Sequence, residues 1–276
     1  MKTKIILPHF LAAAAALMGC NPALYHPGSI NAPLFSRKGE LNVAASMSNS
    51  GTEVQASYSI SDKAAVMLNW SGGNKMKDFY TTDYNYMYDS VYGYSYSMPF
   101  TRQSKSGYRF NYTEGGYGFY LKPQIGRKLR AEVFGLVGAG DAEAGEDWVY
   151  YNATVSYLKY FLQANIGWAG EVTEGALSIR YGYLDLSGMQ TKANANYQPY
   201  GSRFSNSYES HPDGDRSSFF FDPALIFRLG YKGVKLEMQY GISLPSSTWL
   251  AFGWVRCWAS MGMKFRINTS KNISHQ

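Results

Sequence analysis

Hydrophobic and polar residues alternate along most of the chain from Gly39 onward. In the longest unbroken run, residues 234–244, apolar side chains occupy every even position and mostly polar side chains occupy the odd positions. A period of two places successive side chains on opposite faces of a strand, so each run predicts a strand whose faces meet different environments. The run at 234–244 has about the length that a tilted strand needs to cross a bilayer.

The pattern predicts ten strands. They are expected near residues 39–48, 52–60, 64–72, 113–122, 129–140, 157–168, 176–186, 219–231, 234–244 and 254–267. A helical period of 3.6 residues does not occur between them, and the gaps are too rich in Gly and Ser for crossover helices. Because parallel neighbours need such crossovers, the sheet is expected to be antiparallel.

The connections between the predicted strands differ in length in a regular way. Numbered from the N-terminus, the even connections are short, for example Lys232-Gly233. Connections three, five and seven are long, at about 73–112, 141–156 and 187–218, and only the first breaks the trend. Bacterial outer-membrane barrels have tight periplasmic turns and long outer loops. We therefore predict an all-β fold, an antiparallel up-and-down transmembrane β-barrel of about ten strands, with eight or twelve as the alternatives.

Alternation alone does not decide which face points outward. In a soluble lipocalin-like barrel the apolar face lines a ligand cavity, whereas in a membrane barrel it faces lipid. Aromatic residues near strand ends, such as Trp70, Trp168 and Trp254, suit the girdles of a membrane barrel. The polar face carries charges of both signs, which can pair inside a small barrel: Glu40, Glu53, Arg130, Glu132, Lys159, Arg180, Lys235, Glu237, Arg256, Lys264 and Arg266. Together with the loop lengths, these features favour the membrane barrel over the soluble one.

The composition is consistent with this fold. The sequence has 24 Tyr and 28 Gly, charged residues are only 17%, and yet the mean hydropathy is −0.29. The mean hydropathy of a membrane barrel is low because its strands alternate apolar and polar residues, whereas the helices of a membrane bundle are apolar throughout and give a high mean hydropathy. The net charge of +6 is mild and the densest basic run, residues 127–130, lies in a predicted turn, so no nucleic-acid partner is expected.

The N-terminus has the form of a secretory signal. Lys2 and Lys4 precede an apolar run that is too short for a spanning helix. It ends in Leu17, Met18, Gly19 and Cys20, which looks like a bacterial lipobox and implies cleavage before Cys20 and acylation of its thiol. The alternatives are an ordinary signal peptide and an uncut membrane anchor.

These features divide the chain into a signal peptide (1–19), a lipidated tether (20–38), a barrel (39–267) and a C-terminal tail (268–276). The tether contains three prolines and no periodicity, as linkers do. No acidic cluster of the sort linked to surface export of lipoproteins follows Cys20, so we expect its lipid in the periplasmic leaflet. An even strand count then directs the long loops outward. The expected location is the cell outer membrane, with its lipid and lipopolysaccharide as partners.

Three short motifs near the first strand resemble those of a known group of proteins. Tyr25-x-Pro27, Asn31-x-Pro33 and Lys38-Gly39-Glu40 are similar to the start of outer-membrane β-barrel lipoproteins of Bacteroidetes-type bacteria. The resemblance covers the N-terminal third in detail and the remainder only as strand rhythm. It implies the barrel fold and the outer-membrane location. That family brings no assigned reaction, and therefore no catalytic residues.

The third connection is unusually rich in tyrosine. It contains Tyr84, Tyr86, Tyr88, Tyr92, Tyr94 and Tyr96. Their alternation on both sides of Asp89-Ser90-Val91 predicts a hairpin above the membrane with one tyrosine-covered face and its tip at 89–91. Tyrosine supplies amphipathic contact area at small entropy cost, so such a face suits a glycan or a protein partner. The alternative is that these tyrosines pack on the loop itself or on the outer girdle.

Residues with catalytic character are sparse. Only His211 among the histidines lies in a long loop, and no orienting motif surrounds it or the nearby Ser207 and Ser210. The acidic residues of the fifth and seventh connections are expected to be solvated charge. We therefore expect no catalytic residue, no metal site and no cofactor, with a lipid acyltransferase or hydrolase as the enzymatic alternative.

The predicted function is that of a lipoprotein barrel with a filled lumen. Paired charges and amide side chains are expected to fill most of the lumen, so that no wide pore remains. Such a protein would act in envelope structure or in surface interaction through its outer loops. The alternatives are a small outer-membrane channel, a soluble lipid-binding barrel and a lipid-modifying enzyme.

Overall fold

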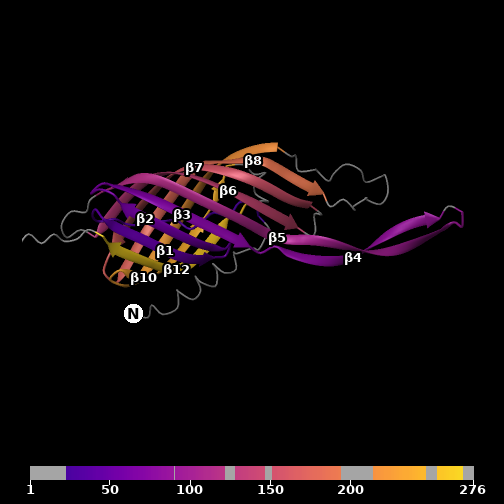
Figure 1. Ribbon diagram of the computed structural model, residues 1–276, viewed down its shortest axis with the longest axis horizontal. Helices are drawn as coiled ribbons and strands as arrows, with labels where there is room; N and C mark the ends of the chain where they lie inside the picture. The colour runs from indigo at the N-terminus through magenta and orange to yellow at the C-terminus, as the bar shows by residue number, and fades with distance from the viewer. Residues whose placement is uncertain are drawn as a thin grey trace, which may run out of the picture.

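The chain forms a closed antiparallel β-barrel of ten strands, as Figure 1 shows. The computed structural model describes residues 23–89, 91–121, 128–146, 151–193, 214–246 and 254–269. The barrel strands are β1 (Glu40–Ser48), β2 (Thr52–Ser59), β3 (Ala64–Asn74), β5 (Tyr94–Tyr120), β6 (Leu129–Glu146), β7 (Tyr151–Ala169), β8 (Thr173–Ala193), β9 (Gly214–Tyr231), β10 (Val234–Ile242) and β12 (Cys257–Asn268). No helix in these ranges is long and apolar enough to span a membrane.

Neighbouring barrel strands in the sequence are neighbours in the sheet, and the first strand closes the ring on the last. β1 pairs with β12 from Glu40↔Asn268 to Ser48↔Ser260. Two elements lie off this cycle: β11 (Leu244–Pro245) extends the pairing with β9, and β4 (Lys77–Asp89) pairs only with the first part of β5. Closure leaves no barrel edge with unpaired backbone groups.

The predicted all-β, antiparallel barrel of about ten strands is confirmed, and each of the ten predicted runs coincides with a barrel strand. The main difference is strand length. β5 begins at Tyr94 and not near residue 113, and β8 continues to Ala193. The first part of β5 is the second strand of the tyrosine hairpin, which the sequence pattern placed in a loop separate from the barrel strand.

The two faces of the barrel wall have opposite polarity, and the apolar face points outward. On β7, Leu162 is 62% exposed whereas its neighbour Gln163 is fully buried. The outward face includes Met47, Leu68, Phe119, Val133, Leu158, Ile166, Leu177, Leu225, Phe227, Val234, Met261 and Phe265. The buried side chains include seven acidic and five basic residues, all of which lie on barrel strands. Most of the charged residues predicted to line the lumen therefore do line it, whereas Arg256 precedes β12 and is exposed.

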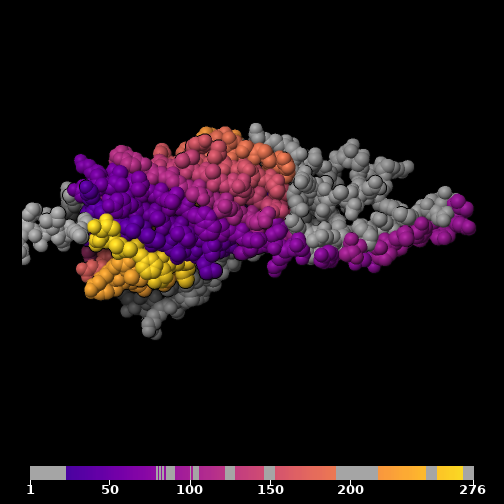
Figure 2. All heavy atoms as spheres, in the orientation of Figure 1, coloured from indigo at the N-terminus to yellow at the C-terminus, as the bar shows by residue number. Residues whose placement is uncertain are grey.

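The barrel has two different ends. At one end, called here the turn end, the strands are joined by turns such as Ser61-Asp62-Lys63 and Lys232-Gly233. At the other, the loop end, β4 and the first part of β5 form a hairpin that extends away from the barrel, as Figures 1 and 2 show. The hairpin meets the wall at Gly107, whose φ of 116° is one that glycine adopts readily.

Residues 23–38, called here the luminal segment, enter the barrel at the loop end and run through its lumen. Tyr25 forms a bridge with Trp254 at the loop end, and Lys38 donates its backbone N–H to Asp62 at the turn end. Ala23, Tyr25, Ile30, Leu34 and Phe35 are all buried. The part of the expected tether that the structure describes is therefore inside the barrel and not a linker outside it. It is held there because the polar wall binds its backbone, as described below.

We expect two adjacent glycines of β5 to respond differently to substitution. A Cβ on Gly116 would lie 2.3 Å from the carbonyl oxygen of Gly135, whereas one on Gly115 would make only ordinary contacts. Gly116→Ala should therefore destabilise the barrel by about 1–3 kcal/mol, as overpacking does. Gly115→Ala is the matched control, with little expected change. The measurement is the denaturant midpoint of the folded band in cold sodium dodecyl sulfate gels; equal midpoints for the two variants would contradict the packing described.

Candidate functional site

The lumen contains the densest set of buried polar contacts in the described residues, and many of them hold the backbone of the luminal segment. The Ile30 N–H donates to Gln239 Oε1 at 2.9 Å, and Gln239 Nε2 donates back to the Ile30 carbonyl at 3.0 Å. Ser29 is held in the same way, by Glu53 Oε2 at its N–H and by Gln55 Nε2 at its carbonyl, at 2.8 and 2.9 Å. Wall side chains thus replace the partner strand that an extended chain normally needs.

The same pattern continues toward the turn end. Gln163 Nε2 donates to the Asn31 carbonyl at 2.7 Å, and Arg228 Nη2 donates to the Ala32 carbonyl at 2.7 Å. The Phe35 N–H donates to Glu132 at 2.6 Å. Each contact satisfies a backbone group that would cost free energy if buried alone.

Apolar side chains of the luminal segment fill the space that remains. Ile30, Ala32 and Leu34 pack with Trp258 and with small wall residues such as Ala224. Leu34 has a φ of 57°, a left-handed conformation that is uncommon outside glycine. It is fully buried, so surrounding contacts hold this conformation in place. Paired charges and amides line the lumen as predicted, and the luminal segment, which the sequence pattern did not reveal, fills the rest.

An Arg–Glu pair lies at the centre of the wall network. Arg180 Nη2 lies 2.9 Å from Glu114 Oε1, and both side chains are almost fully buried. Glu114 also accepts from Asn69 and Tyr112, and Arg180 donates to Gln163. Arg180 reaches the Ser29 carbonyl at 3.4 Å, so the pair is connected to the luminal segment as well.

A second cluster of charges lies near the turn end. Glu174 is within 3.4 Å of Arg228, 2.9 Å of Lys235 and 3.0 Å of Arg266. Arg228 also pairs with Glu237. The cations of this cluster point at the backbone of the luminal segment: Lys264 donates to the Ala32 carbonyl and Arg266 to the Pro33 carbonyl. Charge of both signs and backbone dipoles together replace water in this part of the lumen.

Lys159 lies in a cage of aromatic rings. Its Nζ is 4.6 Å from the ring centre of Phe161, 4.8 Å from Phe220, 5.4 Å from Tyr25 and 5.5 Å from Tyr112. Ring faces attract a cation, most strongly where water is excluded. Tyr25 belongs to the luminal segment, so this segment completes the cage.

His26 anchors the loop end of the luminal segment. Its ring stacks on Phe110 at 4.6 Å between centres and packs on Tyr108 at 4.1 Å, and it contacts the Ala23 carbonyl at 2.8 Å. Burial, with a smaller contribution from the positive charge of Lys75, lowers the pKa of His26 to about 4. The folded barrel therefore holds this imidazole neutral at ordinary pH.

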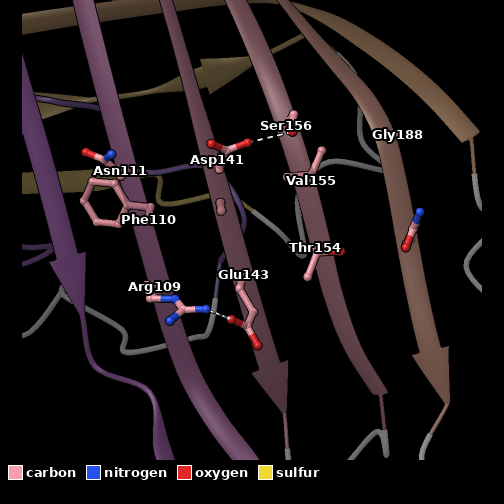
Figure 3. A pocket seen from close by; sticks show the side chains of 11 residues that line it. Arg109, Phe110, Asn111, Asp141, Glu143, Thr154, Val155, Ser156 and Gly188 are labelled. Atoms are coloured by element: carbon pink, nitrogen blue, oxygen red, sulfur yellow. Dashed lines mark hydrogen bonds and ion pairs between the residues drawn. The ribbon is translucent and has the colours of Figure 1, made fainter.

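A polar patch lies on the outside of the barrel near the loop end, shown in Figure 3. It is a shallow depression of about 420 Å³ across strands β5 to β8. Arg109 pairs with Glu143 at 2.6 Å and Ser156 donates to Asp141 at 2.6 Å. The outward face of these strands is therefore apolar toward the turn end and polar toward the loop end. No group of three or more metal-ligating side chains is placed together in the described ranges.

The tyrosine hairpin has the predicted form, but its tyrosines do not share one face. Opposed residues in an antiparallel pair lie on the same face. Tyr84 is opposite Pro99, so even-numbered residues of β4 share a face with odd-numbered residues of β5. Tyr94 and Tyr96 are opposite Asp89 and Met87, and therefore lie on the other face. One tyrosine-covered face was therefore the wrong prediction. The described hairpin tyrosines are exposed, from 40% at Tyr96 to 75% at Tyr92, and Tyr92, Tyr94 and Tyr96 form a row with ring centres 6.2 Å apart.

Several predicted residues lie outside the described part of the chain. These are Leu17, Met18, Gly19, Cys20, Ser207, Ser210 and His211, together with the side chains of Tyr86 and Tyr88, whose backbones pair with Ser97 and Ser95. Sequence reasoning missed the luminal segment and its contacts. The one available signal was the charged and amide face of the strands, because buried polar groups require partners.

No protein-family model and no curated protein matches this sequence. The function must therefore be inferred from the geometry.

We expect the buried and the exposed arginine pairs to differ sharply in mutational cost. Arg180→Met should destabilise the barrel by about 3–5 kcal/mol, because it leaves Glu114 buried without its cation. Arg109→Met removes a pair whose arginine is 63% exposed, so its cost should be about 0–1 kcal/mol. Urea unfolding of detergent-solubilised protein measures both. A small effect of Arg180→Met would mean that the central pair does not hold the network together.

His26 should make the seating of the luminal segment sensitive to acid. A released segment has an ordinary His pKa of about 6.5, so between pH 6.5 and 4 it binds more protons than the seated one. The free energy that seats the segment is therefore complete above pH 6.5 and declines as the pH falls toward 4. Amide protection factors for residues 29–35 should drop between pH 7.5 and 5, and the drop should be smaller in His26→Gln. An equal drop in both proteins would assign the effect to other groups.

Proposed function

We propose that this protein is an outer-membrane β-barrel lipoprotein that does not conduct and that serves as an envelope scaffold, presenting its loop end for surface interaction. The observation that carries the proposal is the inverted wall, with charges inside and a continuous apolar surface outside. A soluble barrel would expose this apolar exterior to water, which is unfavourable, whereas a membrane barrel buries it in lipid. The polar lumen likewise disfavours a lipocalin-like cavity for apolar ligands.

The height of the apolar surface suits a bilayer. The outward positions of β7 are apolar from Trp168 to Leu158 and become polar at Ser156 and Thr154. With a rise of about 3.3 Å per residue and a tilt of about 40°, that stretch is about 25 Å tall, the height of the apolar band of outer-membrane barrels. The polar patch of Arg109, Glu143 and Asp141 would then lie above the lipid on the loop side.

The sequence features of the N-terminus support the same proposal. The signal-like run ending at Cys20 implies export and acylation, and the motifs around Tyr25 and Lys38 resemble those of Bacteroidetes-type barrel lipoproteins. A barrel that crosses with strands is the form that exported outer-membrane proteins take. Location, lipid and fold are thus mutually consistent.

The filled lumen is the reason for proposing a scaffold over a channel. The luminal segment is bonded to wall residues from the loop end to the turn end, and Ile30, Ala32 and Leu34 are fully buried within it. Among the residues that the structure describes, the hairpin, with its exposed row of Tyr92, Tyr94 and Tyr96, reaches furthest from the barrel (Figure 2). It is the surface we propose for contact with a glycan or protein partner.

Planar-bilayer recording tests the closed lumen. The purified full-length protein should give no discrete conductance steps. A variant in which residues 24–35 are replaced by a Gly-Ser sequence of equal length should give steps, because the wall then encloses water. Stable steps from the unmodified protein would favour the small-channel alternative.

Site-specific photocrosslinking in intact cells tests the hairpin. A photoreactive residue in place of Tyr94 or Tyr96 should yield adducts with a surface partner. One in place of Leu162, on the apolar outward face of β7, should yield only lipid adducts. Absence of any adduct specific to the hairpin positions would contradict its role as a contact surface.

A further inference from the structure

The path of the luminal segment places the lipidated end of the chain. We propose that Cys20 and its acyl chains lie at the loop end of the barrel, in the same leaflet as the long loops, so that this protein is anchored from the cell surface and not from the periplasm. The inference rests on the proposed function, namely a lipidated membrane barrel. It reverses the expectation that lipid and loops lie on opposite sides.

The segment crosses the lumen in one direction, and its contacts show the order. Near its start, Tyr25 accepts from the Val255 N–H, and His26 stacks on Phe110. At its middle, Asn31 donates to Asn69 and accepts from Gln163. The contacts of Tyr25 and His26 lie near the loop end, whereas Asn69 is the middle residue of β3 and therefore lies about halfway to the turn end.

The last contacts of the segment lie at the turn end itself. Phe35 bonds to Glu132, close to the start of β6, and Ser36 bonds to Glu40 at the start of β1. Lys38 reaches Asp62 in the turn between β2 and β3. The chain then reverses into β1. A single crossing therefore separates Ala23, at the loop end, from Glu40, at the turn end.

Covalent reach fixes the position of Cys20 relative to Ala23. Three residues span at most about 11 Å even when fully extended. The apolar band of such barrels is about 25 Å tall, so residue 20 cannot return to the turn end. The lumen is also filled by residues 25–35, which leaves no second passage. The acyl chains must enter the membrane from the side on which the chain emerges.

The exposed chemistry of the two ends agrees with a surface-facing loop end. The loop end carries the tyrosine hairpin and the polar patch formed by Arg109, Glu143 and Asp141. The fully described connections at the turn end, residues 60–63, 170–172 and 232–233, are all short. Outer-membrane barrels place short turns in the periplasm. Lipid and hairpin together then face the exterior.

Three tagged full-length proteins test the proposal in cells. The same short epitope is inserted between Asn21 and Pro22, into the hairpin turn at residues 91–93, or between Lys232 and Gly233. Antibody binding to intact cells should detect the first two tags, and the third should become detectable only after permeabilisation. Incorporation of labelled fatty acid and outer-membrane fractionation are measured in parallel, and loss of either would overturn the proposed function independently of topology.

The three tags separate the remaining outcomes. An N-terminal tag that needs permeabilisation while the hairpin tag does not would overturn the proposal. Detection of the Lys232-Gly233 tag alone in intact cells would contradict outward-facing loops, yet it would support the shared location of lipid and loops. Single cysteines offer a smaller probe if a tag disturbs folding: Asn21→Cys, Val91→Cys and Lys232→Cys in a Cys257→Ser background, read with a membrane-impermeant maleimide, should give the same pattern.

Discussion

The constraint on which the structure depends is the need to satisfy a polar wall in a space without room for bulk water. Lumen-facing charges and amides such as Arg228, Gln239 and Gln163 are buried and require partners. Part of the need is met within the wall, as between Arg180 and Glu114. Much of the rest is met by backbone groups of residues 29–35, which present N–H and C=O groups at a regular spacing. The wall and the luminal segment are therefore incomplete without each other.

This dependence explains why the interior is polar although an apolar core would give more hydrophobic stabilisation. The outside of the wall is already apolar, so strand alternation leaves the polar positions to face inward. A wall of that kind cannot pack on itself. It needs an extended interior segment that offers both hydrogen-bond donors and acceptors. The luminal segment offers both, and because Pro27 and Pro33 lack a backbone N–H, the segment is poorly suited to pair as a further strand of the sheet.

The sequence predicted the barrel well because the alternation is a local signal. Each run from 39–48 to 254–267 contains its own evidence for two unlike faces, and the structure has a strand at every one. The same reasoning could not detect the luminal segment. Its partners are remote, as with Ile30 and Gln239 or Arg228 and Ala32, and a chain surrounded by wall on all sides shows no periodicity. A proline-containing, aperiodic stretch is typical of a linker as well.

The hairpin shows a second limit of the same kind. Tyrosine alternation predicted two strands, and the structure has them as β4 and β5. Which tyrosines share a face depends on the register across the turn, and moving the register by one residue exchanges the faces. Asp89 pairs with Tyr94, which sets Tyr84 and Tyr94 on opposite faces. Turn geometry decides this, and residues in the strands themselves carry no information about it.

Strand counting could not locate the chain that precedes β1, for a more general reason. Counting strands relates the start of β1 to the end of β12, and these do lie at the same end, where Glu40 pairs with Asn268. The strand count says nothing about residues before β1 when the chain that joins them to β1 runs through the lumen from one end of the barrel to the other. Nineteen residues lie between Cys20 and Glu40, enough chain to traverse a barrel in extended form. Strand parity therefore fixes topology only for the ends of the sheet, and a segment that crosses the lumen once places the residues before it at the opposite end of the barrel.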